Sequence, residues 1–214
     1  IRRLAVVGGV AAGMSAASQA KRRNPDLEVV VLEKGRHVSY GACGMPYNIQ
    51  DPERDIEDLV VITAERFRQE RGLDVRIGHE VTEIDPGAGR LRVKRSSGEG
   101  ELEFDRLVLA TGCRASSPNW PGLDLPGVFE LHTLEHAGAI KRYLQDRSMK
   151  RAVVVGGGHI GLEMADVIVS RGLGVTLFKR GPEVPSGYPE GISQMVAAEL
   201  QRFGVDLRVG EEIL

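Results

Sequence analysis

A glycine turn that occurs twice is the feature that most constrains the fold. The first turn covers residues 8–13 and follows an apolar run over 4–7, and the second covers 156–161 and follows a similar run over 151–155. Residues suited to a helix follow each turn, and the two turns start 148 positions apart. A strand, a glycine turn and a helix in this order let main-chain N–H groups approach a pyrophosphate closely. The repeat therefore predicts an α/β protein with two Rossmann-like nucleotide-binding domains.

The chain between and around the turns predicts the domain organisation. A β-branched run over 28–33 is typical of a buried strand in a parallel sheet. Short alternating segments over about 74–104 predict an antiparallel β-meander inserted into the first domain. Three prolines within 113–127 mark a linker. We expect a first nucleotide-binding domain over 1–120, a linker and helix over 121–150, and a second domain over 151–214 that lacks its C-terminal part.

The acid that ends the second strand indicates a ribose site. Glu33 follows Gly13 by 20 residues, and a carboxylate at that place accepts hydrogen bonds from ribose hydroxyls. The first turn departs from the motif because Val10 stands where the middle glycine belongs, whereas the second turn is complete. A tight turn without a ligand is the alternative, and turn and acid together favour a dinucleotide at residues 8–13.

The second strand end carries cations instead of an acid. Lys179 and Arg180 stand where a carboxylate would favour a free ribose 2′-hydroxyl, and cations there favour a 2′-phosphate. This indicates NADPH, or use of both NADPH and NADH. A solvated basic strand end is the other interpretation.

The two cysteines, Cys43 and Cys113, receive different interpretations. Cys43 lies in an expected loop over 35–50, at a glycine-flanked turn leading into a helix, where main-chain N–H groups can stabilise a thiolate. No second cysteine lies within five residues, so its oxidised form is a mixed disulfide with a small thiol or a sulfenic acid. Cys113 is expected to be an inert core residue. Two cysteines are too few for a disulfide-stapled scaffold and fit a reducing, cytoplasmic compartment.

Charge and hydropathy exclude several partners. With 28 basic and 30 acidic side chains the net charge is −2, which argues against nucleic-acid binding and against a polybasic membrane arm. The sequence contains no run of about 18 apolar residues, so no membrane span is expected. The N-terminal run is interpreted as a strand and not as a signal peptide. No metal ligand set is expected.

Together these motifs resemble the flavin-dependent pyridine nucleotide-disulfide oxidoreductases. The resemblance covers essentially the whole chain. Within the family, the residues are most similar to the single-cysteine branch, which contains coenzyme A-disulfide reductases, NADH oxidases and peroxidases, and persulfide reductases. It implies electron flow from NADPH or NADH to FAD, then to the catalytic Cys43, and from there to a disulfide, peroxide or oxygen.

The resemblance also implies which residues bind the two cofactors. The FAD set is Gly8, Gly9, Ala12, Gly13, Glu33, Lys34, Val81, Ala110, Thr111 and Gly112. The nicotinamide-nucleotide set is Gly156, Gly158, His159, Ile160, Gly161 and Glu163, with Lys179 and Arg180 at the strand end.

Two departures separate members of the branch. Ala11 stands where oxidases and peroxidases commonly carry a histidine that supports a cysteine sulfenate, which favours reduction of coenzyme A disulfide or a related persulfide. His159 stands where many relatives have a tyrosine that gates the nicotinamide pocket. An NAD(P)H oxidase or peroxidase is the second hypothesis for the function, and an electron-transfer or redox-sensing flavoprotein is the third.

Coenzyme A or a related small thiol is the expected partner. Its phosphates need cations, and Arg22 with Gln19 at the end of the first helix, and Ser39 and Asn48 nearer Cys43, are the expected substrate residues. A favourable set of cations at a helix C-terminus is the alternative reading of the basic cluster. The resemblance further implies a homodimer formed through a C-terminal region outside this chain.

Overall fold

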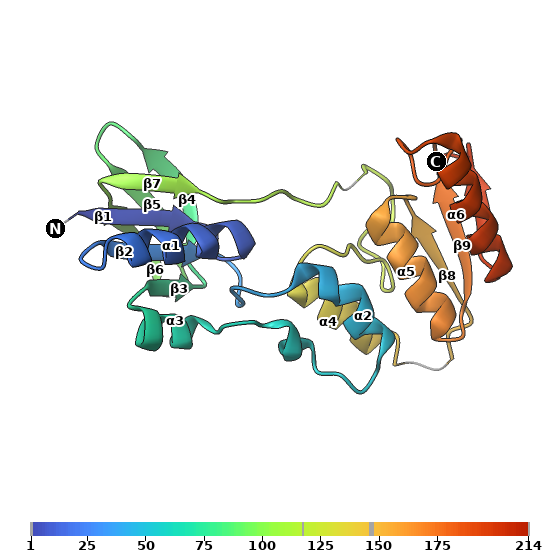
Figure 1. Cartoon of the computed structure of the whole chain (residues 1–214), viewed down its shortest axis with the longest axis horizontal. Coiled ribbons are helices and arrows are strands. Elements are labelled where there is room, and N and C mark those ends of the chain that lie inside the picture. Colours follow the sequence, from blue (N-terminus) through green and yellow to red (C-terminus); the bar gives the residue numbers. More distant parts are fainter. Residues whose placement is uncertain (1, 117, 146–147, 214) are drawn as a thin grey trace. The chain divides into compact units, whose positions relative to one another are not determined.

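The computed structural model describes residues 2–116, 118–145 and 148–213, which form two compact units (Figure 1). Among the described residues, unit 1 comprises 2–41 and 57–114, and unit 2 comprises 42–56, 115–116, 118–145 and 148–213. Residues 1, 117, 146, 147 and 214, which belong to the expected domain and linker ranges, lie outside the described residues.

Unit 1 is built on a four-stranded parallel sheet in the order β3-β2-β1-β7. The strands are β1 (Arg3–Val7), β2 (Glu28–Glu33), β3 (Asp74–Ile77) and β7 (Arg106–Leu109). β1 pairs with β2 from Arg3 opposite Glu28 to Val7 opposite Leu32. The apolar and β-branched runs at 4–7 and 29–32 form these central strands because both faces of the sheet are covered.

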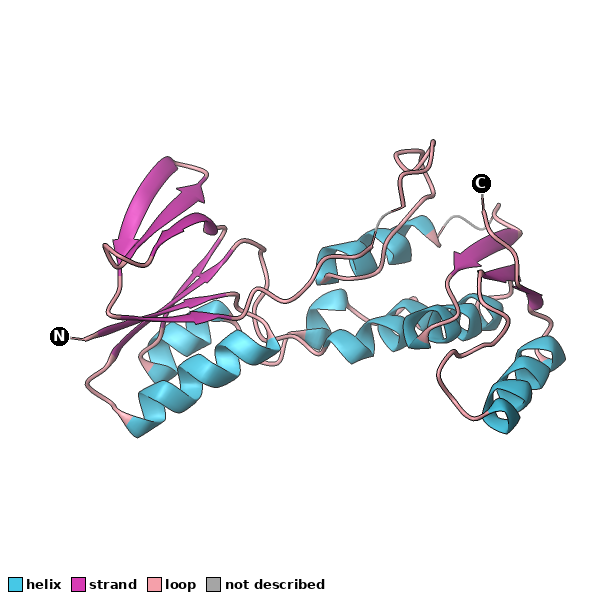
Figure 2. Cartoon of the chain, turned by 90° about the horizontal axis from the view of Figure 1, so that it is seen from above, coloured by secondary structure: helices cyan, strands magenta, loops and turns pink. Residues whose placement is uncertain are grey.

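The two faces of this sheet are covered by different layers (Figure 2). Leu4 and Val6 of β1 lie in a core with helices α1 (Ala11–Arg23) and α3 (Ala64–Arg71). Ala5 and Val7 lie in a second core against the antiparallel sheet of β4 (Glu80–Asp85), β5 (Arg90–Arg95) and β6 (Gly98–Glu103). The alternation follows from the period of two along a strand.

One expectation within this unit is wrong. Residues 74–77 were expected to start the meander, but they form β3, which pairs in parallel with β2. Val75 is fully buried in the core beneath α3, and this burial outweighs the local alternation of polar and apolar residues. The meander itself covers residues 80–103 and is confirmed.

Unit 2 contains a three-stranded parallel sheet in the order β10-β9-β8. Its strands are β8 (Arg151–Val155), β9 (Gly174–Lys179) and β10 (Asp206–Val209), and its helices include α5 (His159–Ser170) and α6 (Glu190–Arg202). Helix α4 (Leu134–Tyr143) and the short helix α2 (Met45–Gln50) also belong to this unit, and α2 packs against both α4 and α5. The 3-10 turn η1 (Ala42–Gly44) directly precedes α2.

The predicted α/β class with two parallel sheets is confirmed. The compact units divide the chain differently from the continuous first domain that we expected over 1–120, because residues 42–56 belong to unit 2. A second 3-10 turn, η2 (Ile56–Leu59), follows this segment. None of the helices in the described ranges is both long and apolar enough to cross a lipid bilayer.

Candidate functional site

The first glycine turn contacts the chain at the ends of β2 and β7, the two strands that flank β1. The N–H of Gly8 donates to the Leu32 carbonyl at 2.9 Å, and Gly8 has φ +105°. A Cβ on Gly8 would lie 2.1 Å from the Ala110 oxygen, and one on Gly13 would lie 1.8 Å from the Gly8 oxygen. Only glycine fits at these two positions, so the helix can start immediately beside the strand end.

The start of α1 is open to an anion. Helices α3 and α4 are capped by the side chains of Thr63 and Thr133, and each has an acid in its first turn. Helix α1 has neither a side-chain cap nor a first-turn acid, and Ala12 in that turn is exposed. Its first N–H groups and the positive end of its dipole are therefore available to a phosphate.

Glu33 locks this turn to the end of β2. The side chain is 8% exposed, and its two carboxylate oxygens accept hydrogen bonds from the N–H groups of Gly9 at 2.7 Å and Gly35 at 2.6 Å. Each oxygen retains a lone pair, so the carboxylate can still accept from ribose hydroxyls. Lys34, the next residue, is exposed.

Two further expected FAD segments lie at the same end of the sheet. The Ala110 N–H donates to the Val7 carbonyl at 2.8 Å, so residues 110–112 continue from β7 alongside the glycine turn, with Thr111 and Gly112 exposed. The His79 N–H donates to the Glu33 carbonyl at 2.9 Å, and Val81 packs against the meander core. The structure thus brings the expected FAD residues of unit 1 together.

The second glycine turn repeats the geometry of the first. The Gly156 N–H donates to the Phe178 carbonyl at 2.8 Å, Gly156 has φ +106°, and a Cβ on Gly161 would lie 1.9 Å from the Gly156 oxygen. Helix α5 likewise has no side-chain cap and no first-turn acid, and Gly158 is its N-cap. This unit therefore holds a second open helix N-terminus at a parallel strand end.

Lys179 occupies in unit 2 the position that Glu33 occupies in unit 1. Phe178 pairs with Val155 as Leu32 pairs with Val7, and the next residue is Lys179 in one unit and Glu33 in the other. A Cβ on Gly157 would lie 3.4 Å from Lys179 Cδ, so the lysine stem runs beside the turn. Arg180 is 82% exposed and only loosely paired, with its guanidinium 3.7 Å from Glu212.

A tyrosine that sequence reasoning missed contacts the first residue of α5. The Tyr188 hydroxyl lies 2.7 Å from His159 Nε2, and the two rings meet edge to face. Tyr188 lies in the Gly- and Pro-containing loop after β9, and an aromatic residue in such a loop was the sequence feature that could have marked it as a site residue. Ile160 is exposed, and Glu163 is half-buried one turn further along α5.

Cys43 lies in η1 with an exposed side chain. The helix that follows, α2, has six residues and occupies the end of the loop that we expected over 35–50, so that expectation is wrong for residues 45–50. Cys113 is also exposed, so its expected place in a core is wrong, because it follows the strand end at 109 in a segment without regular structure. The two cysteines form no disulfide with each other.

The four expected substrate residues lie in three different settings. Gln19 and Arg22 are exposed on α1 and joined by a hydrogen bond of 2.7 Å. Ser39 is half-buried with φ +50°, and its N–H donates to the Gly9 carbonyl at 3.0 Å. Asn48 is only 2% exposed, and both ends of its amide bond to neighbours within unit 2.

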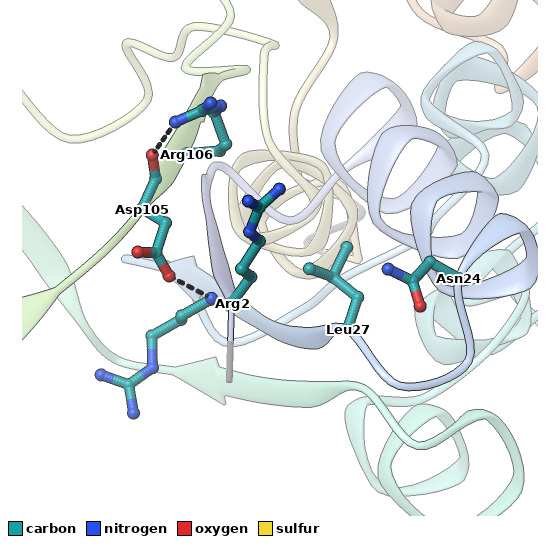
Figure 3. A pocket seen from close by; sticks show the side chains of 6 residues that line it. Arg2, Asn24, Leu27, Asp105 and Arg106 are labelled. Atoms are coloured by element: carbon teal, nitrogen blue, oxygen red, sulfur yellow. Dashed lines mark hydrogen bonds between the residues drawn. The ribbon is translucent and has the colours of Figure 1, made fainter.

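A pocket in unit 1 includes residues at the start of β1 and of β7 (Figure 3). It has a volume of about 340 Å³ and is lined by Arg2, Arg3, Asn24, Leu27, Asp105 and Arg106. Arg3 opens β1 and Arg106 opens β7, so this pocket lies at the amino ends of parallel strands. Nucleotides bind outside the carboxyl ends in such sheets, which separates this pocket from the expected site. Within the described ranges, no group of three His, Cys, Asp or Glu side chains is placed to hold a metal ion.

Comparison with known proteins identifies two curated relatives that differ in their described activity. One is an NADH oxidase of Methanocaldococcus jannaschii, 32% identical over 213 residues, which cover 99% of this chain and 48% of that protein. Another is a coenzyme A disulfide reductase of Staphylococcus haemolyticus, 32% identical over 216 residues, which cover 100% of this chain and 48% of that protein. The chain therefore spans about half the length of these relatives.

A solved structure with the same fold is that of reduced Bacillus anthracis CoADR-RHD. It matches with a TM-score of 0.95 and 29% identity, over 99% of this chain and 39% of that one. The family model for pyridine nucleotide-disulphide oxidoreductases matches residues 2–214. The two glycine turns, the strand-end carboxylate and this match agree, and the chain belongs to the pyridine nucleotide-disulphide oxidoreductase family.

Proposed function

We propose that this chain is the nucleotide-binding and thiol-bearing part of an FAD-dependent NAD(P)H oxidoreductase. Its substrate is coenzyme A disulfide or a related low-molecular-weight disulfide or persulfide, reduced through Cys43. The observation that carries the proposal is the presence in one chain of two uncapped glycine-turn helices and an exposed thiol with no second cysteine nearby.

The residues at the first turn fit FAD. The space that a Cβ on Gly8 or Gly13 would need is filled by main-chain oxygens, α1 offers uncapped N–H groups, and Glu33 offers carboxylate lone pairs. When bound, FAD supplies two-electron chemistry between a nicotinamide and sulfur. The chain's own part is to hold the pyrophosphate at α1 and the ribose at Glu33.

The residues at the second turn fit a nicotinamide nucleotide. Open space lies where a Cβ on Gly156 or Gly158 would stand, and Gly161 lets α5 start against the Gly156 carbonyl, so a pyrophosphate can approach the start of this helix. His159, Ile160 and Glu163 lie along the same helix. Lys179 replaces the ribose-binding acid with a cation, which favours a 2′-phosphate. NADPH is therefore the preferred reductant, with NADH as the alternative.

Lys179→Glu is expected to shift cofactor preference toward NADH. The substitution removes a cation from the 2′-phosphate and restores a carboxylate that accepts from a free 2′-hydroxyl. Loss of one charge-assisted contact corresponds to a change of about tenfold or more in the NADPH-to-NADH ratio of kcat/KM. Lys150→Glu, with the same charge change at an exposed position before β8, is the matched control. An unchanged ratio would place Lys179 in solvent with no contact to the nucleotide.

The reaction balances with one thiol in the protein. The Cys43 thiolate attacks one sulfur of the disulfide, forming a mixed disulfide and releasing the first thiol. Two electrons from the nicotinamide then cleave the mixed disulfide, which releases the second thiol and restores the Cys43 thiolate. Overall, NAD(P)H, one proton and the disulfide give NAD(P)⁺ and two thiols.

Arg22→Ala is expected to raise KM for coenzyme A disulfide by about tenfold, because an exposed cation then no longer meets a substrate phosphate. The exposed pair of Arg22 and Gln19 on α1 supports this role. Arg23→Ala is the control, since it removes the same charge one position further along the helix. Equal KM values for both variants and the wild type would reduce the basic cluster to favourable cations at a helix C-terminus.

The direct test of the proposed function is turnover by the purified full-length enzyme. Consumption of NADPH and NADH is followed with coenzyme A disulfide, a persulfide, oxygen and peroxide as competing acceptors. The proposal expects the sulfur acceptors to be fastest. The NADH oxidase relative supports the alternative, an NAD(P)H oxidase or peroxidase that cycles through a Cys43 sulfenic acid. Faster consumption of oxygen or peroxide would establish that alternative, and electron transfer only to another protein would establish the third reading.

We further propose a reducing, cytoplasmic setting for the enzyme. Both exposed cysteines lack a disulfide between them, which suits the reducing cytoplasm. The net charge of −2 supports neither nucleic acid nor an anionic membrane surface as a partner. We infer a homodimer formed outside this part of the protein.

A further inference from the structure

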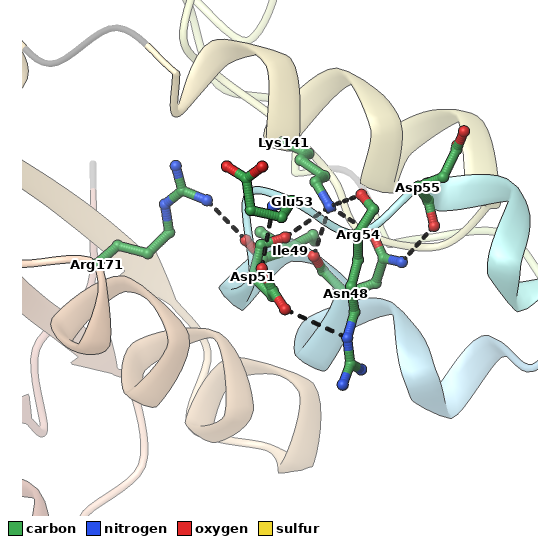
Figure 4. Close-up of polar contacts among 8 residues, drawn as sticks. All are labelled: Asn48, Ile49, Asp51, Glu53, Arg54, Asp55, Lys141 and Arg171. Carbon is green, nitrogen blue, oxygen red and sulfur yellow. Dashed lines mark hydrogen bonds and ion pairs between the residues drawn. The ribbon is translucent and has the colours of Figure 1, made fainter.

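A buried lysine lies at the centre of a set of oxygens in unit 2 (Figure 4). Lys141, on α4, is 6% exposed. Its ammonium donates to the Asn48 carbonyl at 2.9 Å, to Asn48 Oδ1 at 3.0 Å, to the Asp51 carbonyl at 2.7 Å and to the Arg54 carbonyl. Three of the four acceptors are main-chain carbonyls, so the cation on α4 binds the main chain at the end of α2 and in the loop after it.

These carbonyls belong to the end of α2 and the loop after it. The last carbonyls of a helix have no partner within the helix, and α2 ends at Gln50. Cations at this end are favoured by the helix dipole as well. Asn48 Nδ2 donates to the Asp55 carbonyl at 2.7 Å, which closes the loop around the ammonium. Burial lowers the pKa of Lys141, and the Asp51 and Asp55 carboxylates oppose that effect.

A second cation holds the same helix end. The Arg171 guanidinium, at the end of α5, donates to the Ile49 carbonyl at 2.9 Å and to the Leu144 carbonyl at 3.0 Å. It therefore joins the end of α2 to the residue after α4. Lys141 and Arg171, which we call the cation clamp, bind α2 from the two helices against which it packs.

The clamped segment carries the thiol. Cys43 lies in η1, which runs without a break into α2, so the last residue of the helix, Gln50, is seven positions after the thiol. A buried ammonium is costly compared with an apolar side chain of similar size. An apolar side chain at position 141 would leave the Asn48, Asp51 and Arg54 carbonyls without this donor.

We propose that Lys141 and Arg171 are positioning residues that fix the Cys43 segment through the carbonyl end of α2. The hydrogen bonds described for them go to residues 48–54 and to Leu144, and not to the thiol. The role rests on the proposed function, because a fixed thiol matters for turnover only if Cys43 exchanges with a disulfide. It explains why Asn48, expected at the substrate, is buried: its amide completes the clamp.

Lys141→Met in the full-length holoenzyme tests the proposal, with Lys150→Met as the matched control at an exposed site. Turnover of coenzyme A disulfide is expected to fall by about tenfold or more, since small displacements of a reacting group have effects of this size. Reduction of the bound flavin by NAD(P)H is expected to stay within about twofold, because that step does not use the thiol.

Two readouts do not depend on turnover. Amide hydrogen exchange over residues 43–50 is expected to accelerate by about tenfold or more in Lys141→Met and to stay at the wild-type rate in Lys150→Met. The ratio of the alkylation rates of Cys43 and Cys113 is expected to change as well, with Cys113 in unit 1 as the internal reference.

The outcomes separate this proposal from the proposed function. A folded Lys141→Met with wild-type exchange, alkylation ratio and turnover would overturn the cation clamp. A wild type without disulfide turnover would remove the proposed function, while exchange and alkylation would still measure the clamp. If Lys141→Met does not fold, Arg171→Leu removes the second cation alone, and partial recovery of the wild-type ratio by Arg171→Lys is expected.

Discussion

Cys43→Ser is expected to abolish coenzyme A disulfide reduction while leaving reduction of the bound flavin by NAD(P)H intact. The serine hydroxyl cannot form the mixed disulfide, whereas hydride transfer from the nicotinamide needs no thiol. Stopped-flow absorbance separates the two half-reactions. Disulfide turnover should fall by about a thousandfold or more, to the level of the uncatalysed exchange. Any long-wavelength thiolate-to-flavin absorption of the two-electron-reduced enzyme should vanish with it.

Cys113→Ser is the matched control for this experiment. Both cysteines are exposed, so general loss of a surface thiol affects both variants alike. The control is expected to retain disulfide turnover within about twofold of the wild type. Substantial turnover by Cys43→Ser would remove Cys43 from the mechanism. Loss in the Cys113→Ser variant alone would transfer the role to Cys113.

The glycine turns were predictable because their requirement is local. At Gly13 and Gly161 a Cβ would lie within 2 Å of a main-chain oxygen five residues earlier. The glycine spacing of the motif is therefore set by steric contacts within a single turn. The position of Glu33 at the end of β2 was predictable from its spacing of 20 residues after Gly13. Lys179 could be matched to Glu33 in the same way, because each ends the second strand after its glycine turn.

Contacts between distant segments were not predictable from the sequence. Asn48 was assigned to the substrate because it lies five residues from Cys43, yet its amide bonds to Lys141, 93 positions away. Lys141 itself received no interpretation, since a lysine in a charged helix is usually exposed. The parallel pairing of β3 was missed for the same reason, because only burial of Val75 against α3 distinguishes it from the meander.

The largest expected effect on flavin binding comes from Glu33→Ala. The carboxylate is 8% exposed and accepts from the N–H groups of Gly9 and Gly35, and we propose that it also accepts from the FAD ribose. Alanine leaves two main-chain donors without their acceptor and removes the ribose contact. Loss of one charge-assisted hydrogen bond costs about 1.5–3 kcal/mol, or about a 10- to 150-fold rise in Kd. Titration of the apoenzyme with FAD, followed by flavin fluorescence, measures this change.

Two further variants of β2 decide what that result means. Glu28→Ala removes an acid at the start of the same strand, where it pairs with Arg3 at a partly exposed site, and is expected to leave Kd for FAD unchanged. Glu33→Gln keeps one side-chain oxygen as an acceptor and is expected to fall between wild type and alanine. If Glu33→Ala folds and binds FAD as tightly as Glu28→Ala does, the carboxylate only fastens the glycine turn, and the ribose must be held by another residue at the strand ends of unit 1.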